Sequence, residues 1–248
     1  MIGKPLRGVV VCALTSLMLS AASGRSLELF VADAPPVTMI ASDKERGIVG
    51  DLVVLAIEKA GYAPRIHNLP WMRSQLQVSA GIDQLIIPLS RTPEREEKFT
   101  WIAPVMPMER AFFSLDTPVA SFQEAKTRYR AIAVGAGTAQ LEILKQQGFD
   151  DKQIHILKLG DSPVRMLQLG RVDAWFTGVP EGQYAWPNRE VRAVAEKLKM
   201  SRVLHSVDLY LACSLDCDAD VVKRLRSSVQ ALKQDGTLKK ISKSYMKN

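Results

Sequence analysis

The chain of 248 residues has a formal net charge of +7, and 47% of its residues are hydrophobic, which is enough for one large domain or two small ones. Its Lys and Arg residues are interleaved with acidic residues and form no basic, aromatic-rich stripe of the kind that binds nucleic acid. We therefore expect no nucleic-acid partner, and a solvated surface whose positive field draws anionic ligands inward.

The first 24 residues differ from the rest of the chain. Lys4 and Arg7 precede an apolar run from Gly8 to Leu19, and the small residues of "SAASG" follow it. This order is typical of a cleaved secretory signal peptide. The alternative is a membrane anchor, for which the run is short of the roughly 20 residues needed. We expect residues 1–24 to be removed on export, and no other stretch is apolar enough to cross a bilayer.

Predicted strands and helices alternate along the remaining chain. The first part is predicted to contain strands over 27–32, 65–69 and 82–89 and helices over 50–62 and 71–80. The second part is predicted to contain strands over 110–115, 130–137, 153–159 and 172–178, helices over 121–128, 138–148 and 161–170, and two final helices within 222–246. Such alternation predicts an α/β fold with mainly parallel sheets.

A cation stands at an unusual place after the strand over 82–89. Thr92 is a good helix N-cap and Pro93 suits the first helical position, so Arg95 falls in the first turn, at the positive end of the helix dipole. A bound anion would satisfy both the arginine and the helix end. The alternative is that Arg95 extends to solvent or pairs with Glu94 or Glu96.

A second corner, after the strand over 130–137, is rich in glycine. Gly135 and Gly137 allow a tight turn, and Thr138 can cap the next helix. A dinucleotide fingerprint is not satisfied, because its third glycine is replaced by Gln140. Taken alone, the turn is an ordinary strand–helix connection or a backbone anion site. If the two corners belong to different lobes, they face each other across a cleft, where a carboxylate would accept hydrogen bonds from Arg95.

Five segments resemble the periplasmic solute-binding proteins of ABC importers, in the family typified by polar amino-acid binders (family 3). They are "GIVGDLVVLAIEKAGY" (47–62), "IDQLIIPLSRTPEREEKFTWIAPV" (82–105), "VGAGTAQLEIL" (134–144), "MLQLGRVDAWFTG" (166–178) and "LKQDGTLKKISKSY" (232–245). They occur in the family's order. The resemblance implies a two-lobe periplasmic binding protein fold (type II), with two hinge crossings near 105–111 and 204–209. Lobe 1 would comprise 25–108 and 208–248, and lobe 2 would comprise 109–207.

The resemblance also assigns site residues. It implies that Arg95 grips a ligand carboxylate, with Pro88 and Ser90 in the same motif and Gly137 and Thr138 in the second-lobe corner.

Two departures from the family pattern affect the rest of the site. The acid that usually holds a ligand ammonium is absent at Thr177 and Gly178, and the sequence leaves open whether Glu181 reaches that place. An early aromatic residue is also absent, since Ala34 and Pro35 occupy its segment. Trp71 could replace it, with Arg73 one helix step further along. The alternative for Trp71 is a packing residue.

We therefore expect a monomeric, non-catalytic periplasmic protein, without a cofactor, that binds a small anionic or zwitterionic solute and docks on an ABC permease in the inner membrane. One alternative is a dehydratase-like enzyme on the same scaffold, for which Asp33 and Glu181 are the available acids, although no motif supports them. The other is a ligand-sensing module that docks on a membrane receptor.

The cysteines point to a disulfide. Removal of the signal peptide discards Cys12 and leaves Cys213 and Cys217, and a close pair in an exported protein is expected to be oxidised. The alternative is two free thiols. We expect no zinc site, because His67, His155 and His205 lack ligand spacing (all three histidines of the chain).

Overall fold

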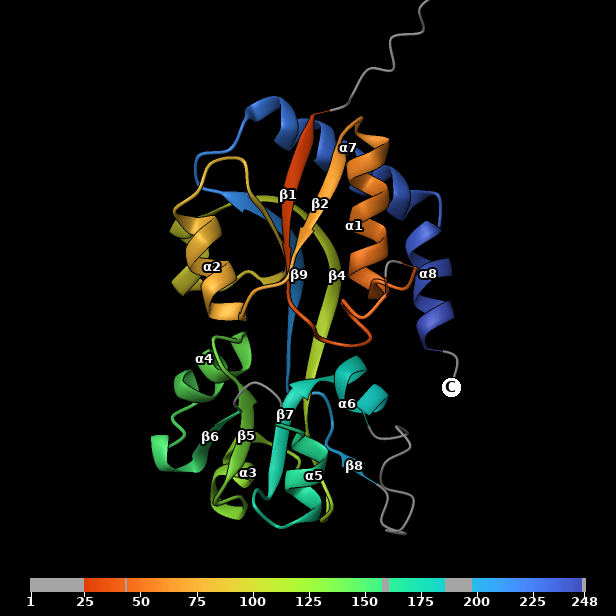
Figure 1. Ribbon diagram of the computed structural model, residues 1–248. Helices are drawn as coiled ribbons and strands as arrows, with labels where there is room; N and C mark the ends of the chain where they lie inside the picture. The colour runs from red at the N-terminus through yellow and green to blue at the C-terminus, as the bar shows by residue number, and fades with distance from the viewer. Residues whose placement is uncertain (1–24, 43, 158–160, 186–197, 247–248) are drawn as a thin grey trace, which may run out of the picture.

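The computed structural model describes residues 25–42, 44–157, 161–185 and 198–246, and it has the expected α/β, two-lobe architecture (Figure 1). The predicted signal peptide, residues 1–24, lies outside the described residues. Within the described ranges, none of the helices combines the length and the apolar character that a bilayer span requires.

One mixed sheet runs through both lobes in the order β2-β1-β3-β9-β4-β7-β5-β6, and a short strand β8 pairs with β4. The strands are β1 (Ser26–Val31), β2 (Ala63–His67), β3 (Leu85–Ser90), β4 (Phe99–Ser114), β5 (Ile132–Gly135), β6 (Ile154–Leu157), β7 (Ala174–Gly178), β8 (Lys199–Met200) and β9 (His205–Ser214). Strand β1 is parallel to β2 and β3, and β5 is parallel to β6 and β7, so each lobe has the parallel core that the alternating pattern predicts.

Strands β4 and β9 connect the lobes (Figure 1). They pair antiparallel as far as Arg110 opposite His205, and this pairing includes the predicted crossings near 105–111 and 204–209. The predicted lobe boundaries fall inside these two continuous strands, so the assignment of individual residues to a lobe stays a prediction.

Helices cover the sheet in both lobes. The first lobe carries α1 (Gly47–Lys59), α2 (Trp71–Ser79), α7 (Ala219–Gln234) and α8 (Thr237–Tyr245), and the second carries α3 (Phe122–Arg128), α4 (Ala139–Gln146), α5 (Pro163–Gln168) and α6 (Val179–Ala185). Two short 3₁₀ helices are η1 (Pro93–Lys98) and η2 (Asp151–Gln153). The segment after Thr92, expected to be an α-helix, is therefore a single 3₁₀ stretch. Helix α6 and strand β8 are additions to the predicted elements.

Each lobe has its own hydrophobic core. In the first lobe, Leu225 and Val229 of α7 are fully buried in a core that also includes residues of β1 and α1, as expected for apolar residues four positions apart on one helix face. In the second lobe, Phe112 of β4 is 1% exposed and packs against a group of aromatic rings, namely Phe122, Tyr129, Phe149 and Phe176. Separate cores allow the lobes to move as two bodies about β4 and β9.

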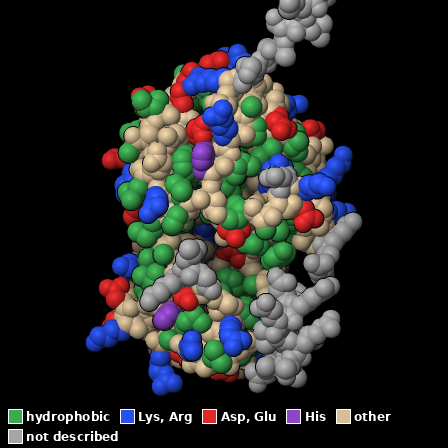
Figure 2. Space-filling view, in the orientation of Figure 1, with side chains coloured by type: hydrophobic (Ala, Val, Ile, Leu, Met, Phe, Trp, Pro, Cys, Tyr) green, Lys and Arg blue, Asp and Glu red, His purple; other side chains and the backbone are tan. Residues whose placement is uncertain are grey.

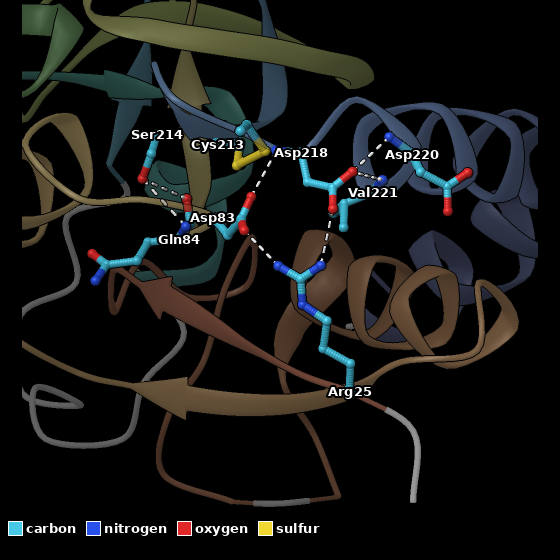
Figure 3. A network of polar contacts seen from close by, with 9 residues as sticks. Arg25, Asp83, Gln84, Cys213, Ser214, Asp218, Asp220 and Val221 are labelled. Atoms are coloured by element: carbon cyan, nitrogen blue, oxygen red, sulfur yellow. Dashed lines mark hydrogen bonds and ion pairs between the residues drawn. A yellow bond between two sulfur atoms is a disulfide. The ribbon is translucent and has the colours of Figure 1, made fainter. Parts of the chain in front are cut away.

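The predicted disulfide is confirmed. Cys213 lies near the end of β9, Cys217 lies two residues before α7, and their Cα atoms are 6.2 Å apart. Figure 3 shows the polar network beside this corner, in which the Arg25 guanidinium donates to the carboxylates of Asp83 and Asp218. The Asp218 N–H also donates to Asp83 (2.6 Å). The corner thus ties the start of β1 to the start of α7.

We predict that the protein, alkylated without reduction under denaturing conditions, shows no alkylation of Cys213 or Cys217 by mass spectrometry. The cross-linked loop is very short, so replacing both Cys213 and Cys217 with serine should lower the free energy of unfolding by only about 2 kcal/mol. Two alkylated thiols in the unreduced sample would contradict the pairing. A reduced and alkylated sample is the positive control.

Candidate functional site

A cavity of about 430 Å³ lies between the lobes, beyond the carboxyl ends of β1, β3 and β5. Its polar lining comes from the first lobe (Asp33, Ser90, Arg95), from the crossing strand β4 (Arg110) and from the second lobe (Thr138, Gln140, Asp161, Glu181). Figure 2 shows this part of the surface hollowed, with basic and acidic side chains inside. A wider cavity of about 830 Å³ shares Asp33, Thr138 and Glu181 with it and extends towards Trp175 and Tyr184.

The cavity brings together most of the residues predicted for the site. They are Trp71, Pro88, Ser90, Arg95, Thr138 and Glu181. Gly137 lies beside the cavity, where its backbone carbonyl accepts hydrogen bonds from Arg95 (3.1 Å) and Gln75 (2.9 Å) across the lobes.

Arg73, predicted as a ligand-binding residue one helix step beyond Trp71, is not brought to the cavity. Arg73 is exposed and is not among the residues that line the cavity. Two positions along a helix correspond to a rotation of roughly 200°, so the two side chains leave α2 on nearly opposite sides. Trp71 itself lines the cavity, is half-buried and also packs against the core beneath α2, so its predicted contact with a ligand stays a prediction beside its packing role.

The arginine of the first corner is engaged across the cleft. Arg95 is 4% exposed, and its Nη2 donates to Glu142 Oε1 (2.7 Å) on α4 as well as to the Gly137 carbonyl. Its Nη1 donates to the Ser90 carbonyl (3.3 Å). The predicted pairing with Glu94 or Glu96 does not occur among the described contacts, because the side chain points into the cleft.

Neither threonine caps its helix through the side chain. Thr138 Oγ1 donates backwards to the Gly135 carbonyl (2.8 Å), and Thr92 Oγ1 is buried without a hydrogen-bond partner among the described residues. Both residues do hold the extended backbone of an N-cap. The N–H groups at the start of α4 therefore have no side-chain cap from Thr138.

Arg110 also lines the cavity, although its position was not predicted from the sequence. It is 1% exposed, with Nη2 donating to Ser90 Oγ (2.7 Å) and Nη1 to the Met108 carbonyl (3.1 Å). No hydrogen-bond partner for its Nε, and no ion pair of its guanidinium, exists among the described residues. Burial lowers the pKa of Arg110 to about 10, partly offset by the negative charge of Glu181, so the side chain remains a cation at neutral pH.

The Glu181 carboxylate lies beside Thr177 and Gly178, the positions at which the family's acid is absent. It accepts hydrogen bonds from the Thr177 hydroxyl and the Gly178 N–H (3.0 Å) at the start of α6. A Cβ atom at Gly178 would lie 3.1 Å from Glu181 Oε2 and 2.6 Å from Met108 Sδ, so the carboxylate lies beside the place where a side chain at position 178 would begin. Burial raises the pKa of Glu181, and the bonds from Thr177 and Gly178 partly offset the rise.

The described residues provide one group with the composition of a metal site, namely Asp83, Cys213 and Cys217. Its two sulfur atoms are bonded to each other in the disulfide. Thiolates are the metal-binding form of cysteine, so this group does not suit a metal while it is oxidised.

The sequence matches the model of a family described as bacterial extracellular solute-binding proteins, family 3, over residues 29–248. No curated protein matches the chain.

Several solved structures share the fold. A histidine kinase sensor domain with similarity to periplasmic binding proteins is 17% identical, with a TM-score of 0.78 over 90% of this chain and 97% of the other. An arginine-, lysine- and histidine-binding protein from Geobacillus stearothermophilus is 16% identical, with a TM-score of 0.76 over 90% and 96%. An ancestral amino acid-binding protein, a precursor of cyclohexadienyl dehydratase, is 18% identical, with a TM-score of 0.71 over 89% and 94%. These similarities confirm the expected two-lobe fold.

Proposed function

The chain belongs to family 3 of the bacterial extracellular solute-binding proteins, and from this premise we propose that it captures a small carboxylate-bearing solute, an amino acid or a related compound, between its lobes and delivers it to an ABC permease. We expect the mature protein to act in the periplasm as a monomer. Closure of the lobes on the solute would create the form that the permease recognises.

The observation that carries this proposal is the pairing of opposite charges in the inter-lobe cavity. Arg110 is a buried cation without an ion-pair partner among the described residues, and Glu181 is a partly buried acid on the second lobe. A zwitterion presents the complementary pair of charges. Its carboxylate would face the arginine side of the cavity, and its ammonium would face Glu181.

The proposal is tested by a thermal-shift screen of the mature protein. The panel contains the twenty L-amino acids, opines, dicarboxylates and short peptides. It includes arginine, lysine and histidine because a protein with the same fold binds them. A true ligand binds the native state and raises its melting temperature, and it should be recovered chemically unchanged after incubation. The proposal fails if no panel compound raises the melting temperature, and conversion of a compound would favour the dehydratase-like alternative.

Replacing Glu181 with glutamine should weaken binding of an α-amino acid about tenfold or more, because the ammonium loses a charged acceptor. The exposed Glu97 offers a matched control, since Glu97→Gln removes one acidic charge outside the cavity. Isothermal titration calorimetry compares the two variants. Equal loss in both, or no loss in either, would show that Glu181 does not contact the solute.

The same carboxylate should make binding depend on pH. Its pKa is raised by burial, so amino-acid affinity should fall as the pH drops through that raised value, and Glu181→Gln should abolish this dependence. For the ligand-free protein the sign is opposite. The folded state holds the Glu181 proton more tightly than the unfolded state does, so its contribution to stability decreases as the pH rises from the unfolded pKa through the folded one. Denaturation curves across this pH range measure it.

A further inference from the structure

Two buried arginines reach the cleft, and their partners differ. Arg95 and Arg110 are 4% and 1% exposed, and both contact Ser90, one through its backbone carbonyl and the other through its hydroxyl. The resemblance to the family assigns the ligand carboxylate to Arg95. The contacts of the two guanidinium groups support a different division of roles.

Arg95 already has an acidic partner. Its Nη2 donates to Glu142 Oε1 at 2.7 Å and to the Gly137 carbonyl at 3.1 Å, and both acceptors belong to the opposite lobe. Two further bonds cross the lobes nearby, from Gln75 to Gly137 and from Gln146 to Glu94 (2.7 Å). A solute carboxylate that bound Nη2 of Arg95 would compete with Glu142 for it and weaken this set of inter-lobe contacts.

Arg110 is the guanidinium that makes no ion pair among the described residues, although the negative charges of Glu181 and Glu142 act on it from farther away. Its two described hydrogen bonds go to neutral oxygen atoms, and its Nε has no partner among the described residues. A buried charge without a partner is unfavourable, and it becomes favourable only when an anion and hydrogen bonds compensate its desolvation. Arg110 lines the inter-lobe cavity, so an anion held in the cavity is the available compensation.

We propose that Arg110 binds the anionic group of the solute, whereas Arg95 holds the closed lobes together through Glu142. This inference rests on the proposed function, because it concerns the solute of the same cavity. Arg110 provides the planar, two-pronged donor geometry that suits a carboxylate. Ser90 holds the guanidinium in place from the end of β3 and simultaneously accepts the bond from Arg95, so the two roles are coupled through one residue.

The test compares Arg110→Met, Arg110→Lys and Arg95→Met by calorimetry. The probes are the L-amino acid of the panel that binds the wild type most tightly and the carboxamide of the same amino acid, which lacks the negative charge. Arg110→Met should bind the amino acid at least about 30-fold more weakly and should lose the preference for the amino acid over its carboxamide. Arg95→Met should weaken both probes by a similar factor and keep that preference.

Two variants guard against a purely structural explanation. Arg110→Met removes an unpaired buried cation, so the ligand-free variant should melt no lower than the wild type. Arg110→Lys keeps the charge without the two-pronged geometry and should recover part of the affinity and of the preference. If Arg110→Met does not fold, Arg110→Lys alone tests the proposal. An unchanged preference of Arg110→Lys for the amino acid over its carboxamide would overturn it.

Replacing Glu142 tests whether Arg95 holds the lobes together or binds the solute carboxylate. If Arg95 holds the lobes together, Glu142→Gln should bind the amino acid more weakly. Tighter binding by Glu142→Gln would mean that Glu142 competes with the solute for Arg95, and this would overturn the inference. The inference would also be overturned if Arg110→Met kept the wild-type preference for the amino acid over its carboxamide. If no panel compound binds the wild type, the proposed function fails and the inference falls with it, an outcome distinct from binding that is independent of Arg110.

Discussion

Replacing Arg95 with alanine should lower solute affinity by about 2–5 kcal/mol while both lobes remain folded. The side chain is one partner of a buried, hydrogen-bonded charge pair between the lobes, and truncating such a partner costs roughly this amount. In the proposed function the closed form binds the solute, so destabilising that form lowers the apparent affinity. The hydrophobic cores do not include Arg95, so denaturation of each lobe should be little changed.

Arg91 is the matched control for this prediction. It lies four residues earlier, is exposed, and pairs with Glu96 on its own lobe through Nε (2.8 Å). Arg91→Ala should therefore leave affinity within a few tenths of a kcal/mol of the wild type. Calorimetry measures the affinities, and small-angle scattering of the ligand-free proteins should show Arg95→Ala as the more open molecule. Equal affinities and equal radii of gyration would contradict a role in closure.

Replacing Gly47 with alanine should lower the free energy of unfolding by about 2–5 kcal/mol. Gly47 has φ of 82°, and an added Cβ would lie 2.7 Å from both Thr38 Cα and the Val37 carbonyl oxygen. The left-handed backbone alone costs a side chain about 1–2 kcal/mol. The collision involves backbone atoms and adds roughly 1–3 kcal/mol. It would also separate α1 from the segment whose carbonyls accept the first N–H groups of the helix, including Ile48 to Pro36 (2.9 Å).

Gly61 carries only the first of these costs, that of the left-handed backbone. It has φ of 87°, nearly the same as Gly47, but an added Cβ would meet no atom within 4 Å. Gly61→Ala should therefore lose only the backbone contribution. Urea denaturation of both variants measures the difference, which should favour Gly61→Ala by roughly 1–3 kcal/mol. If the two variants lose equal stability, the collision at Gly47 is relieved by a small local shift and the prediction is wrong.

Local sequence patterns predicted the order of strands and helices because amphipathic periodicity and glycine stops act within a single element. The same patterns predicted only a short strand over 110–115, whereas β4 runs from Phe99 to Ser114. Pro104 and Pro107 argue against a long strand, since proline lacks the N–H that a ladder requires. In the structure β4 shifts register with β9 between Pro104 and Met106. This irregularity accommodates the N–H donor that Pro104 lacks.

The site was predictable where it follows from local motifs, as with Ser90, Arg95 and Thr138. Arg110 was missed because it lies within an apolar strand pattern and becomes a cleft residue only through its tertiary neighbours. These are Gly178, opposite it on β7, and Ser90, which accepts its hydrogen bond. The sequence indicates the role of Arg110 only by placing a charged residue next to the buried residues of a strand. Glu181 had a clearer local signal, since an acid in the first turn of a helix can accept a bond from the N–H groups at its start.

The connection of the lobes through β4 and β9 has a consequence for how the chain reaches its native state. The second core draws on one continuous stretch of chain, whereas the first joins Leu27 and Leu29 to Leu225 and Leu232, roughly 200 positions further along. Closing such a long loop carries a larger entropic cost than forming the local contacts of the second lobe. The first lobe can therefore complete its core only after α7 has been synthesised, and β1 is made long before its last native contacts can form.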